Sequence, residues 1–457
     1  MSAGRVGVVG LARSGRAAAR LALASGATVY ACDDADTPEL QQAAAPLREL
    51  GAVITLGGAS RAELAACEII VVSPGVPPGA PSLAAAEASG ARLIGEVEWA
   101  YGHLSCPVIA VTGTNGKSTT TAWIAHLLEA SGRKAPAAGN IGLALSEIAL
   151  RQPAPDWAVV EVSSFQLART ERFAPRIGVL TNLAPDHLDR YATVGDYYAD
   201  KARLFRNATD RSVWVLNGED AAARALPGAA PGERLYFRVD SRLEAGERGG
   251  FVDERDTLVL RLPRGDVPLL PASEMKLLGR HNVANALAAA LAAKSAGAPC
   301  GSVAAGLRGF TGLEHRLEVV IERGGVVWIN DSKATNVAST NVALESMTRP
   351  TVLLLGGRHK GESYTALLPE LRRHVRYVIA YGEAARRIET ELASAVRVER
   401  VEGGFDAVIE RAADVAAFGD AVLLSPACAS FDMFRDYEDR GRQFKLLALG
   451  RGEADHG

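Results

Sequence analysis

Short runs of apolar residues alternate with longer amphipathic stretches along most of the chain. In the first part, the apolar runs are residues 6–9, 28–31 and 69–72, and alanine- and leucine-rich stretches separate them. Short apolar runs are typical of buried strands, and apolar positions three and four apart are typical of helices. Strands that alternate with helices predict a parallel sheet. Residues 1–96 are therefore predicted to form a Rossmann-like α/β domain.

The alternation recurs twice further along the chain, over residues 97–311 and 312–457. The further apolar runs are 108–112, 158–162, 177–182, 326–329, 351–355, 377–380 and 421–424. Residues 205–275 are richer in Arg, Gly and Pro, and we expect an irregular β subregion there. We predict three linked α/β domains, of which the third is again Rossmann-like.

Net charge and the distribution of apolar residues limit the kinds of partner that we expect. The 457 residues carry a net charge of −3, which gives no broad electrostatic footprint for nucleic acid or acidic membranes. No apolar stretch is long enough to cross a bilayer, and the N-terminus leads into the first predicted strand rather than into a signal peptide. We expect a cytoplasmic monomer with a small-molecule partner.

The five cysteines are scattered and never spaced Cys-x-x-Cys, which argues against disulfides and zinc. Lysine usage is more informative. Only eight of the fifty basic residues are lysine, so a lysine within a motif is a candidate for chemistry that arginine cannot perform. The lysines that meet this condition are Lys117, Lys201, Lys333 and Lys360.

The strongest motif is Thr112-Gly-Thr-Asn-Gly-Lys-Ser-Thr119, between an apolar run and an amphipathic stretch. This is the order of a phosphate-binding loop, in which Lys117 reaches the terminal phosphates and Ser118 binds Mg²⁺. Val111 replaces the first glycine of the full P-loop pattern, and an ordinary glycine turn is the alternative. We predict a P-loop-type ATPase domain with ATP held by Gly113, Thr114, Asn115, Gly116, Lys117, Ser118 and Thr119.

Polar motifs follow the next two apolar runs. Glu161 stands at the C-terminal end of a predicted strand, where sheet ligands bind. It could share Mg²⁺ with Ser118 or pair with an arginine. The following run leads into Asp186-His-Leu-Asp-Arg190, in which His187 could ligate a second metal or be a structural histidine.

Lys201 lies on a predicted helix after this motif. Its ammonium would repel Mg²⁺ unless carbamylation changed its charge, and the alternative is a surface lysine in an ion pair one helical turn away. Asn140, in a glycine-flanked loop, could bond a phosphate or a substrate carbonyl, or supply a left-handed turn. Asn282 and Asn285 open an alanine-rich helix and could meet ATP or cap that helix.

The first predicted strand also ends in a glycine turn, Gly7-Val-Val-Gly10-Leu-Ala-Arg-Ser-Gly15, and the second ends at Asp33-Asp34. An acid at this distance can bind a ribose, but the glycine spacing departs from G-x-G-x-x-G. A nucleotide site and a plain βαβ turn with a solvated carboxylate pair both stay open.

The third region repeats the pattern of polar motifs near apolar runs, and these motifs are predicted to ring a second nucleotide and carboxylate site. They are Glu314-His-Arg316, Asn330-Asp-Ser-Lys-Ala-Thr-Asn336, Gly356-Gly-Arg-His-Lys360 and Ser425-Pro-Ala-Cys-Ala-Ser430.

Together these motifs resemble the Mur ligase family, the ATP-dependent amide ligases of peptidoglycan precursor assembly, over essentially the whole chain. Residues 112–119 are shared broadly in that family, whereas Glu161-Val-Ser-Ser-Phe-Gln-Leu167, residues 330–336 and Leu424-Ser-Pro-Ala-Cys-Ala-Ser430 resemble its D-glutamate-adding branch. The resemblance implies that ATP, two Mg²⁺, UDP-N-acetylmuramoyl-L-alanine and D-glutamate are used.

The resemblance also implies a mechanism and a role for each domain. The γ-phosphoryl group of ATP passes to the alanyl carboxylate, and the amine of D-glutamate attacks the acyl phosphate. Residues 1–96 are implied to bind the UDP substrate, residues 97–311 to bind ATP and Mg²⁺, and residues 312–457 to bind D-glutamate and contact ATP.

The site residues follow from the same resemblance. Those implied to be catalytic are Lys117, Glu161, His187 and Lys201, and those implied to hold metal are Ser118, Glu161, His187 and carbamylated Lys201. Further contacts implied for ATP are Asn282, Asn285, Arg316 and Asp331. Contacts implied for the UDP substrate are Ser14, Asp33, Ser73, Gly75 and Asn140. Contacts implied for D-glutamate are His187, Thr335, Lys360, Ser430 and Tyr437.

Two positions depart from the family pattern. Tyr437 is often phenylalanine, and Asp34-Ala35 stands where family members carry Thr-Arg, so a basic phosphate contact is either lost or supplied by Arg13. Other classes stay open: a nicotinamide oxidoreductase, which would not need the Lys117 loop, and a switch or scaffold NTPase, although no Asp-x-x-Gly switch motif is found. A ligase that adds L-alanine or is of the folylpolyglutamate type is the rival within the family.

Overall fold

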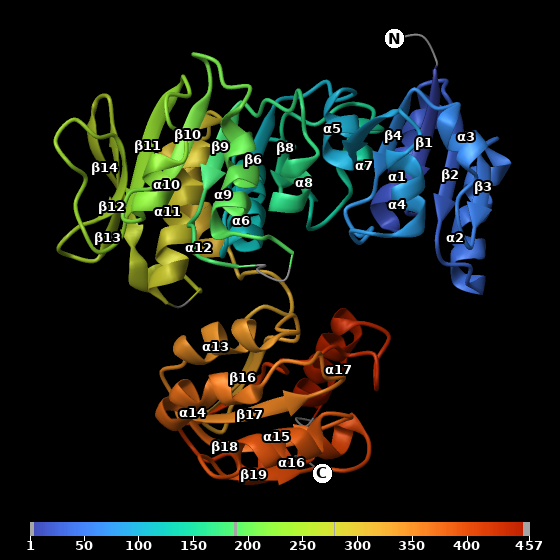
Figure 1. Cartoon of the computed structure of the whole chain (residues 1–457). Coiled ribbons are helices and arrows are strands. Elements are labelled where there is room, and N and C mark those ends of the chain that lie inside the picture. The colour runs from blue at the N-terminus through green and yellow to red at the C-terminus, as the bar shows by residue number, and fades with distance from the viewer. Residues whose placement is uncertain (1–3, 187–189, 278, 451–457) are drawn as a thin grey trace. The chain divides into compact units, whose positions relative to one another are not determined.

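The computed structural model describes residues 4–186, 190–277 and 279–450. The chain divides into two compact units, Met1–Phe310 and Thr311–Gly457. Two sheets belong to the first unit and one to the second (Figure 1). All three are α/β in character, as predicted.

The N-terminal sheet has five parallel strands in the order β3-β2-β1-β4-β5. Its strands are β1 (Arg5–Val9), β2 (Thr28–Asp33), β3 (Val53–Leu56), β4 (Ile69–Val72) and β5 (Arg92–Gly95). The connecting helices are α1 (Arg13–Ala24), α2 (Pro38–Glu49), α3 (Arg61–Ala65) and α4 (Pro81–Glu87). The strand order reverses between β1 and β4, which is where open α/β sheets bind ligands. The predicted strands are confirmed.

The central sheet has nine strands in the order β14-β13-β12-β11-β10-β9-β6-β8-β7. They are β6 (Val108–Thr112), β7 (Ala137–Gly139), β8 (Ala158–Glu161), β9 (Ile177–Leu180), β10 (Val213–Asn217), β11 (Glu233–Arg238), β12 (Gly249–Val252), β13 (Thr257–Leu262) and β14 (Gly265–Pro271). The predicted β character of residues 205–275 is confirmed, but the region is not separate, because β10 to β14 continue this sheet. Val215 packs into one core and Trp214 into another, so β10 is buried on both faces.

Helices cover both faces of the central sheet (Figure 1). They are α5 (Glu96–Tyr101), α6 (Lys117–Ala130), α7 (Leu145–Ala149), α8 (Ser164–Ala168), α9 (Val194–Ala202), α10 (Ala221–Ala225), α11 (Arg280–Ser295) and α12 (Cys300–Gly309), with 3₁₀ turns at Arg203–Phe205 and Ala272–Glu274. Trp123, Leu287 and Leu307 join α6, α11 and α12 in one core. The core on the other face runs from Val160 to Ala18 of α1, which explains why the first two sheets form one unit.

The second unit has a six-stranded sheet in the order β15-β16-β20-β17-β18-β19, with only β15 antiparallel to its neighbour. The strands are β15 (Glu318–Arg323), β16 (Val326–Asn330), β17 (Thr351–Gly356), β18 (Val375–Tyr381), β19 (Val398–Arg400) and β20 (Ala421–Leu424). The four runs predicted as strands are confirmed.

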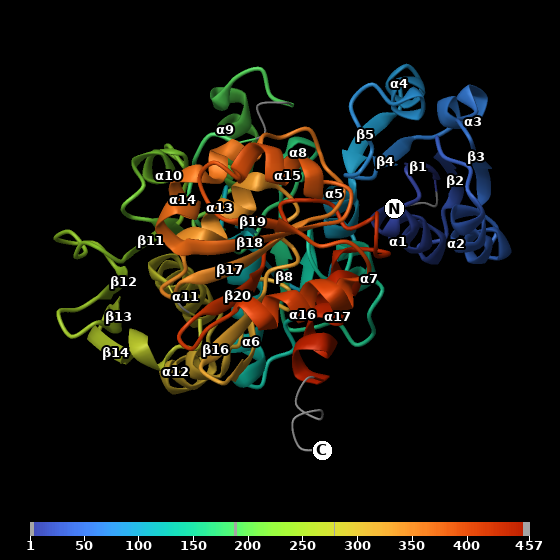
Figure 2. The ribbon, with the colours of Figure 1, turned by 90° about the horizontal axis from the view of Figure 1, so that it is seen from below.

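Five helices sandwich this sheet. Leu344, Leu371 and Ile388 bring α13 (Val337–Glu345), α14 (Leu368–His374) and α15 (Ala385–Leu392) into the core of one face. Ile409 and Phe444 bring α16 (Phe405–Val415) and α17 (Tyr437–Gly450) into the core of the other, where Figure 2 shows them together. A 3₁₀ turn, η3, spans Tyr364–Leu367. Among the described residues of both units, no helix is long and apolar enough to cross a membrane.

Candidate active site

The predicted phosphate loop connects β6 to the N-terminus of α6, which begins at Lys117. Gly113 and Gly116 have φ values of +144° and +80°, a region that favours glycine. A Cβ on Gly113 would lie 2.0 Å from Thr181 Oγ1, and one on Gly116 would lie 2.4 Å from Asn285 Oδ1. The predicted order of strand, glycine loop and helix is confirmed, and it places helix N–H groups where phosphate oxygens can bind.

The segment after β9 holds this loop in place. Thr181 Oγ1 donates to the Asn115 carbonyl at 2.6 Å, and Asn182 Oδ1 accepts from the Asn115 N–H at 2.9 Å. Thr114 Oγ1 donates to the Ala184 carbonyl at 3.1 Å. The loop is therefore fixed from outside before any ligand binds, which lowers the entropy that ligand binding would cost.

Two lysines converge on the loop. Lys117 Nζ donates to the Thr114 carbonyl and Lys201 Nζ to the Gly113 carbonyl, each at 2.7 Å. Lys201 lies on α9, as predicted, and is 1% exposed, so the alternative of a surface lysine is wrong. Its ammonium group lies 4.5 Å from the centre of the Tyr197 ring.

The surroundings of Lys201 favour the neutral amine. Burial and the nearby charge of Lys117 lower the pKa of Lys201 to about 7, although Asp186 and Glu161 act in the opposite direction. Near neutral pH, a large fraction of this side chain is therefore an uncharged nucleophilic amine.

Glu161 ends β8 and is 1% exposed. Its neighbour across the sheet is Val111 of β6, one position before the end of that strand. Oε1 accepts from Asn140 Nδ2 at 2.8 Å, whereas Oε2 is buried and has no hydrogen-bond partner among the described residues. Among the described residues no arginine forms an ion pair with Glu161, so the predicted alternative of an arginine partner fails.

A buried carboxylate oxygen without a partner is costly unless a cation or a donor meets it. Carboxylate and hydroxyl oxygens are the ligands that Mg²⁺ prefers, and Ser118 is buried at the start of α6. These two residues therefore fit a Mg²⁺ ion. Within residues 4–186, 190–277 and 279–450, no three His, Cys, Asp or Glu side chains gather as a metal-ligand set. His187 lies outside the described residues.

Asn140, predicted to contact the UDP substrate, lies beside Glu161 and does not supply a left-handed turn. Its N–H donates to the Glu161 carbonyl at 3.0 Å. The positive φ values fall on Gly139 and Gly142 instead, at +95° and +64°. The amide of Asn140 therefore helps to orient the carboxylate of Glu161.

Asn282 and Asn285 meet the phosphate loop at the start of α11. Asn285 Oδ1 accepts from Thr120 Oγ1 at 3.2 Å, and Asn285 Nδ2 donates to Asn282 Oδ1 at 3.2 Å. Among the described residues, the N-cap position is Gly279 and no side chain forms a cap hydrogen bond there, so neither asparagine is the N-cap residue. The structure brings both asparagines to the loop that is predicted to bind ATP.

The residues predicted to contact the UDP substrate, apart from Asn140, lie at the switch point of the N-terminal sheet. Ser14 Oγ and Ser73 Oγ are 2.9 Å apart, and Gly75 lies in the exposed turn after β4. Asp33 Oδ2 accepts from the Leu11 N–H at 2.7 Å. Asp34 is exposed and accepts from the N–H and hydroxyl of Ser82, so the alternative of a solvated carboxylate pair stays open.

The second unit has a buried acid at the corresponding edge of its sheet. Asp331 follows β16, is 5% exposed, and accepts from the Leu317 N–H at 3.2 Å and from Ser425 Oγ at 2.8 Å. Burial raises its pKa to about 7, against the lowering effects of Ser425 and the charge of Arg316. The predicted ATP residues Arg316 and Asp331 are therefore close enough to interact electrostatically.

The described residues that are predicted to bind D-glutamate all lie in this unit. They are Thr335, Lys360, Ser430 and Tyr437. Lys360 Nζ donates to Thr335 Oγ1 at 3.3 Å, and Lys360 belongs to the loop after β17. A pair of backbone hydrogen bonds joins Arg358 to Ala429, which brings this loop to the one with Ser430. Tyr437 begins α17, and its carbonyl accepts from Ser332 Oγ.

Several residues of the site were not predicted. Tyr197 lies under Lys201 and its hydroxyl is 3.3 Å from Thr114 Oγ1. Its position four residues before Lys201 on a predicted helix is a signal that could have found it. Arg440 is fully buried and bonds Ser332 and Cys428. No local signal distinguishes it from the many other arginines.

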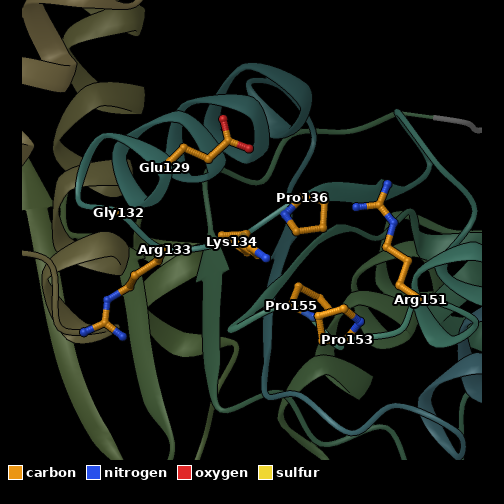
Figure 3. Close-up of a pocket in the computed structure, with 9 residues that line it drawn as sticks. Glu129, Gly132, Arg133, Lys134, Pro136, Arg151, Pro153 and Pro155 are labelled. Atoms are coloured by element: carbon orange, nitrogen blue, oxygen red, sulfur yellow. The ribbon is translucent and has the colours of Figure 1, made fainter.

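Figure 3 shows a pocket of about 420 Å³ near the C-terminal end of α6, with Arg133 and Arg151 on opposite sides. It is lined by Glu129, Gly132, Arg133, Lys134, Ala135, Pro136, Arg151, Pro153 and Pro155. The 14 residues of α6 span about 20 Å between this pocket and the phosphate loop. None of the predicted site residues lines it.

Three family models match the chain in order. Residues 4–95 match the Mur ligase MurD-like N-terminal domain, residues 111–293 the Mur ligase middle domain, and residues 315–428 the Mur ligase glutamate ligase domain. The three matched segments fall on the three sheets described above.

Curated relatives match over nearly the whole chain. A protein of Anaeromyxobacter dehalogenans is 44% identical and one of Salinibacter ruber is 43% identical, each over 97% of both chains. A protein of Acidobacterium capsulatum is 41% identical over 98% of this chain and 97% of its own. All three are named UDP-N-acetylmuramoylalanine--D-glutamate ligase.

Solved structures share the fold at low identity. UDP-N-acetylmuramate-alanine ligase MurC from Thermotoga maritima aligns with a TM-score of 0.60 at 19% identity over 99% of both chains. A pseudomurein peptide ligase from Methanothermus fervidus aligns with a TM-score of 0.58 at 19% identity, over 98% of this chain and 100% of its own. The three-domain architecture is therefore that of these proteins.

Proposed function

The chain belongs to the Mur ligase family, and from this premise we propose that it forms the amide bond between UDP-N-acetylmuramoyl-L-alanine and D-glutamate. ATP is converted to ADP and phosphate, and the reaction belongs to peptidoglycan precursor synthesis. One observation supports the chemistry above all: a phosphate loop with two lysines lies beside a buried Glu161 oxygen that has no hydrogen-bond partner within the residues that the structure describes. The D-glutamate-adding identity is supported by relatives at 41–44% identity.

The first step activates the alanyl carboxylate. A carboxylate oxygen forms a bond to the γ-phosphorus while the bond from that phosphorus to the ADP oxygen breaks, which gives an acyl phosphate and ADP. Two anions must approach each other, so positive charge at the loop is the main requirement. Lys117 supplies such charge from the start of α6, and its bond to Thr114 ties it to the loop.

Mg²⁺, when bound, supplies further positive charge and a fixed arrangement of oxygens at the phosphates. We assign one ion to Ser118 and Glu161, with Asn140 orienting the carboxylate. We assign a second ion to His187 and a carbamate on Lys201. To form the carbamate, the neutral amine nitrogen of Lys201 bonds to the carbon of CO₂ and releases a proton. The burial of this amine beside Lys117 and Glu161 supports that assignment.

The second step forms the amide. The amine nitrogen of D-glutamate bonds to the carbonyl carbon, the carbon–oxygen bond to phosphate breaks, and the nitrogen loses a proton. Lys360 offers positive charge for a carboxylate of the acceptor, and Thr335 fixes its ammonium group. We assign Ser430 and Tyr437, together with His187, to the same acceptor. For ATP we assign Asn282, Asn285, Arg316 and Asp331.

The N-terminal sheet supplies the site for the uridine nucleotide. We assign Ser14, Asp33, Ser73 and Gly75 to it because they gather at the switch point between β1 and β4. The bond from Leu11 fixes the Asp33 carboxylate. We propose domains of 1–96, 97–311 and 312–457, acting as a cytoplasmic monomer.

Phosphate release from ATP tests this function. The protein is incubated with ATP, Mg²⁺ and UDP-N-acetylmuramoyl-L-alanine, and with D-glutamate, L-glutamate, L-alanine or no amino acid. We expect release, and a product of the corresponding mass, with D-glutamate alone. Turnover with another acceptor would move the protein to a different ligase of the family, and release without any acceptor would support a simple NTPase.

A further inference from the structure

Two loops of the second unit hold Lys360 and Ser430, two of the residues that we assign to the acceptor amino acid. The first, residues 356–360, ends in Lys360, and the second, residues 425–430, ends in Ser430. Their backbones meet where Arg358 and Ala429 exchange hydrogen bonds at 2.8 Å and 3.1 Å. A Cβ on Gly357 would lie 2.3 Å from the Ala429 carbonyl oxygen, so the approach leaves no space for a side chain there.

A tyrosine hydroxyl joins the same two loops through side chains. Tyr364 Oη lies 3.1 Å from Nδ1 of His359 in the first loop and 2.9 Å from Sγ of Cys428 in the second. The His359 and Tyr364 rings also pack at a centroid distance of 5.5 Å. Each bridged residue is close in sequence to an assigned acceptor contact, since His359 precedes Lys360 and Cys428 is two residues before Ser430.

Burial and a backbone hydrogen bond fix the position of Tyr364. Tyr364 is 1% exposed within the core that also contains Leu367, Leu371 and Cys428. Its N–H donates to Glu391 Oε2 at 2.7 Å, which anchors the start of η3 to α15. Nε2 of His359 is buried and has no hydrogen-bond partner in the described part of the chain, so the Tyr364 hydroxyl is the polar contact that fixes this ring.

We propose that the Tyr364 hydroxyl is a positioning group for the acceptor amino acid, because it fixes the distance between the Lys360 loop and the Ser430 loop. The inference rests on the proposed function, since it takes the acceptor to be bound by these two loops. Tyr364 does not touch the acceptor. It acts through His359 on one loop and through Cys428 on the other.

The physical basis is a hydroxyl that both donates and accepts a hydrogen bond. A tyrosine hydroxyl has one proton to donate and can accept from a second group, so it can bond His359 and Cys428 together. Burial keeps the pKa values of Tyr364 and Cys428 above their ordinary ranges, so both groups keep their protons at neutral pH. An acceptor with two carboxylates needs both loops at a fixed spacing, and a loose loop would weaken its binding because the loop would have to be ordered when the acceptor binds.

Tyr364→Phe removes the hydroxyl and leaves the ring to fill the core. We expect the KM for D-glutamate to rise about fivefold, as for the loss of one buried hydrogen bond, while kcat and the KM values for ATP and the UDP substrate change less than about twofold. The matched control is Tyr377→Phe, because Tyr377 is buried in the core on the other face of this unit's sheet and its hydroxyl bonds Glu399.

Two further measurements make the inference independent of activity and of a folding defect. In the ligand-free protein, hydrogen exchange at residues 357–360 and 427–430 should be faster in Tyr364→Phe and unchanged in Tyr377→Phe. Combining Tyr364→Phe with Cys428→Ala should give the same KM for D-glutamate as Tyr364→Phe alone, since both break one network.

The outcomes separate the two proposals. A wild-type protein without D-glutamate-dependent turnover would overturn the proposed function, and the exchange comparison would still decide whether the hydroxyl holds the loops. Unchanged exchange overturns the inference whatever the activity. With an active wild type, an unchanged KM for D-glutamate, an equal rise in Tyr377→Phe, or additive effects in the double variant would also overturn it.

Discussion

The first unit and the second unit each bury a carboxylate and a cation at the ligand-binding edge of a sheet, but the bonding of these groups differs. In the described part of the first unit, one oxygen of Glu161 has no hydrogen-bond partner, and the hydrogen bond of Lys201 is to the Gly113 carbonyl. In the second, both oxygens of Asp331 accept hydrogen bonds, and Arg440 makes four hydrogen bonds to Ser332 and Cys428.

The difference indicates that the buried charges of the two units have different roles. Buried charge with unused bonding capacity is costly in the free protein and is expected where a ligand or metal completes it. Buried charge whose bonds are complete holds loops together. We therefore expect variants of the first kind to lose turnover and variants of the second kind to lose stability.

The largest effect is expected for Lys117→Ala. Turnover, measured as D-glutamate-dependent ADP release, should fall on the order of 10³-fold, because the charge that faces the transferred phosphoryl group is lost. The matched control is Lys134→Ala, an exposed lysine just beyond the other end of α6. If Lys117→Ala kept more than about a tenth of the activity, Lys117 would not supply the charge that phosphoryl transfer needs.

Glu161→Gln keeps the shape of the side chain and an oxygen to accept from Asn140, and removes the charge. We expect turnover to fall on the order of 10²-fold and the half-saturating Mg²⁺ concentration to rise, because the amide is a weaker Mg²⁺ ligand. A Mg²⁺ titration of ADP release measures both. Glu171→Gln, which affects an ion pair with Arg92, serves as the control. An unaltered Mg²⁺ dependence in Glu161→Gln would contradict the assignment of Glu161 as a Mg²⁺ ligand.

Arg440→Met should act on stability. It leaves the Ser332 and Cys428 carbonyls buried without donors, and we expect a loss of about 3 kcal/mol in the second unit. Lys201→Met loses one hydrogen bond and a disfavoured buried charge, so its cost should be below about 1 kcal/mol. Hydrogen exchange resolves the unfolding free energy of each unit. A greater loss of unfolding free energy in Lys201→Met than in Arg440→Met would contradict the comparison of the two units.

The smallest effect is a pH dependence at Asp331. Its pKa is about 7 in the folded protein against an ordinary value of 3.8, so between these values the folded state binds the proton and the unfolded state does not. The contribution of Asp331 to the stability of the wild-type protein therefore falls as the pH rises from 3.8 to about 7. Asp331→Asn has no such loss, and its stability relative to wild type should grow by on the order of 2 kcal/mol from about pH 5 to about pH 6.5. A difference independent of pH would contradict the burial argument.

The sequence predicts features that contiguous residues encode. The phosphate loop, its strand and its helix lie within residues 108–130, and the apolar runs identify most of the strands around the sites. Contacts between distant residues are not predicted in the same way. Lys201 reaches Gly113 across 88 positions, and Arg440 reaches Ser332 across 108. Helical periodicity alone favours an exposed Lys201, and only the fold shows that it is buried.

Residues 205–275 were predicted to be β, but their continuity with the central sheet was not predicted, for a related reason. The Arg, Gly and Pro content there reflects turns and the exposed end of the sheet, whereas strand pairing depends on partners elsewhere in the chain. Val213 of β10 pairs with Ile177 of β9, and this pairing joins the region to the central sheet. Local composition has no information about that partner.

The transfer of oxygen from substrate to phosphate tests the central claim most directly, namely that the first unit activates a carboxylate by phosphorylation. UDP-N-acetylmuramoyl-L-alanine labelled with ¹⁸O in its alanyl carboxylate is turned over with ATP, Mg²⁺ and D-glutamate, and the released phosphate is analysed by mass spectrometry. The oxygen that attacks phosphorus leaves with phosphate when the amide forms, so each phosphate should contain one labelled oxygen. Phosphate without label, released in step with amide product, would contradict the account.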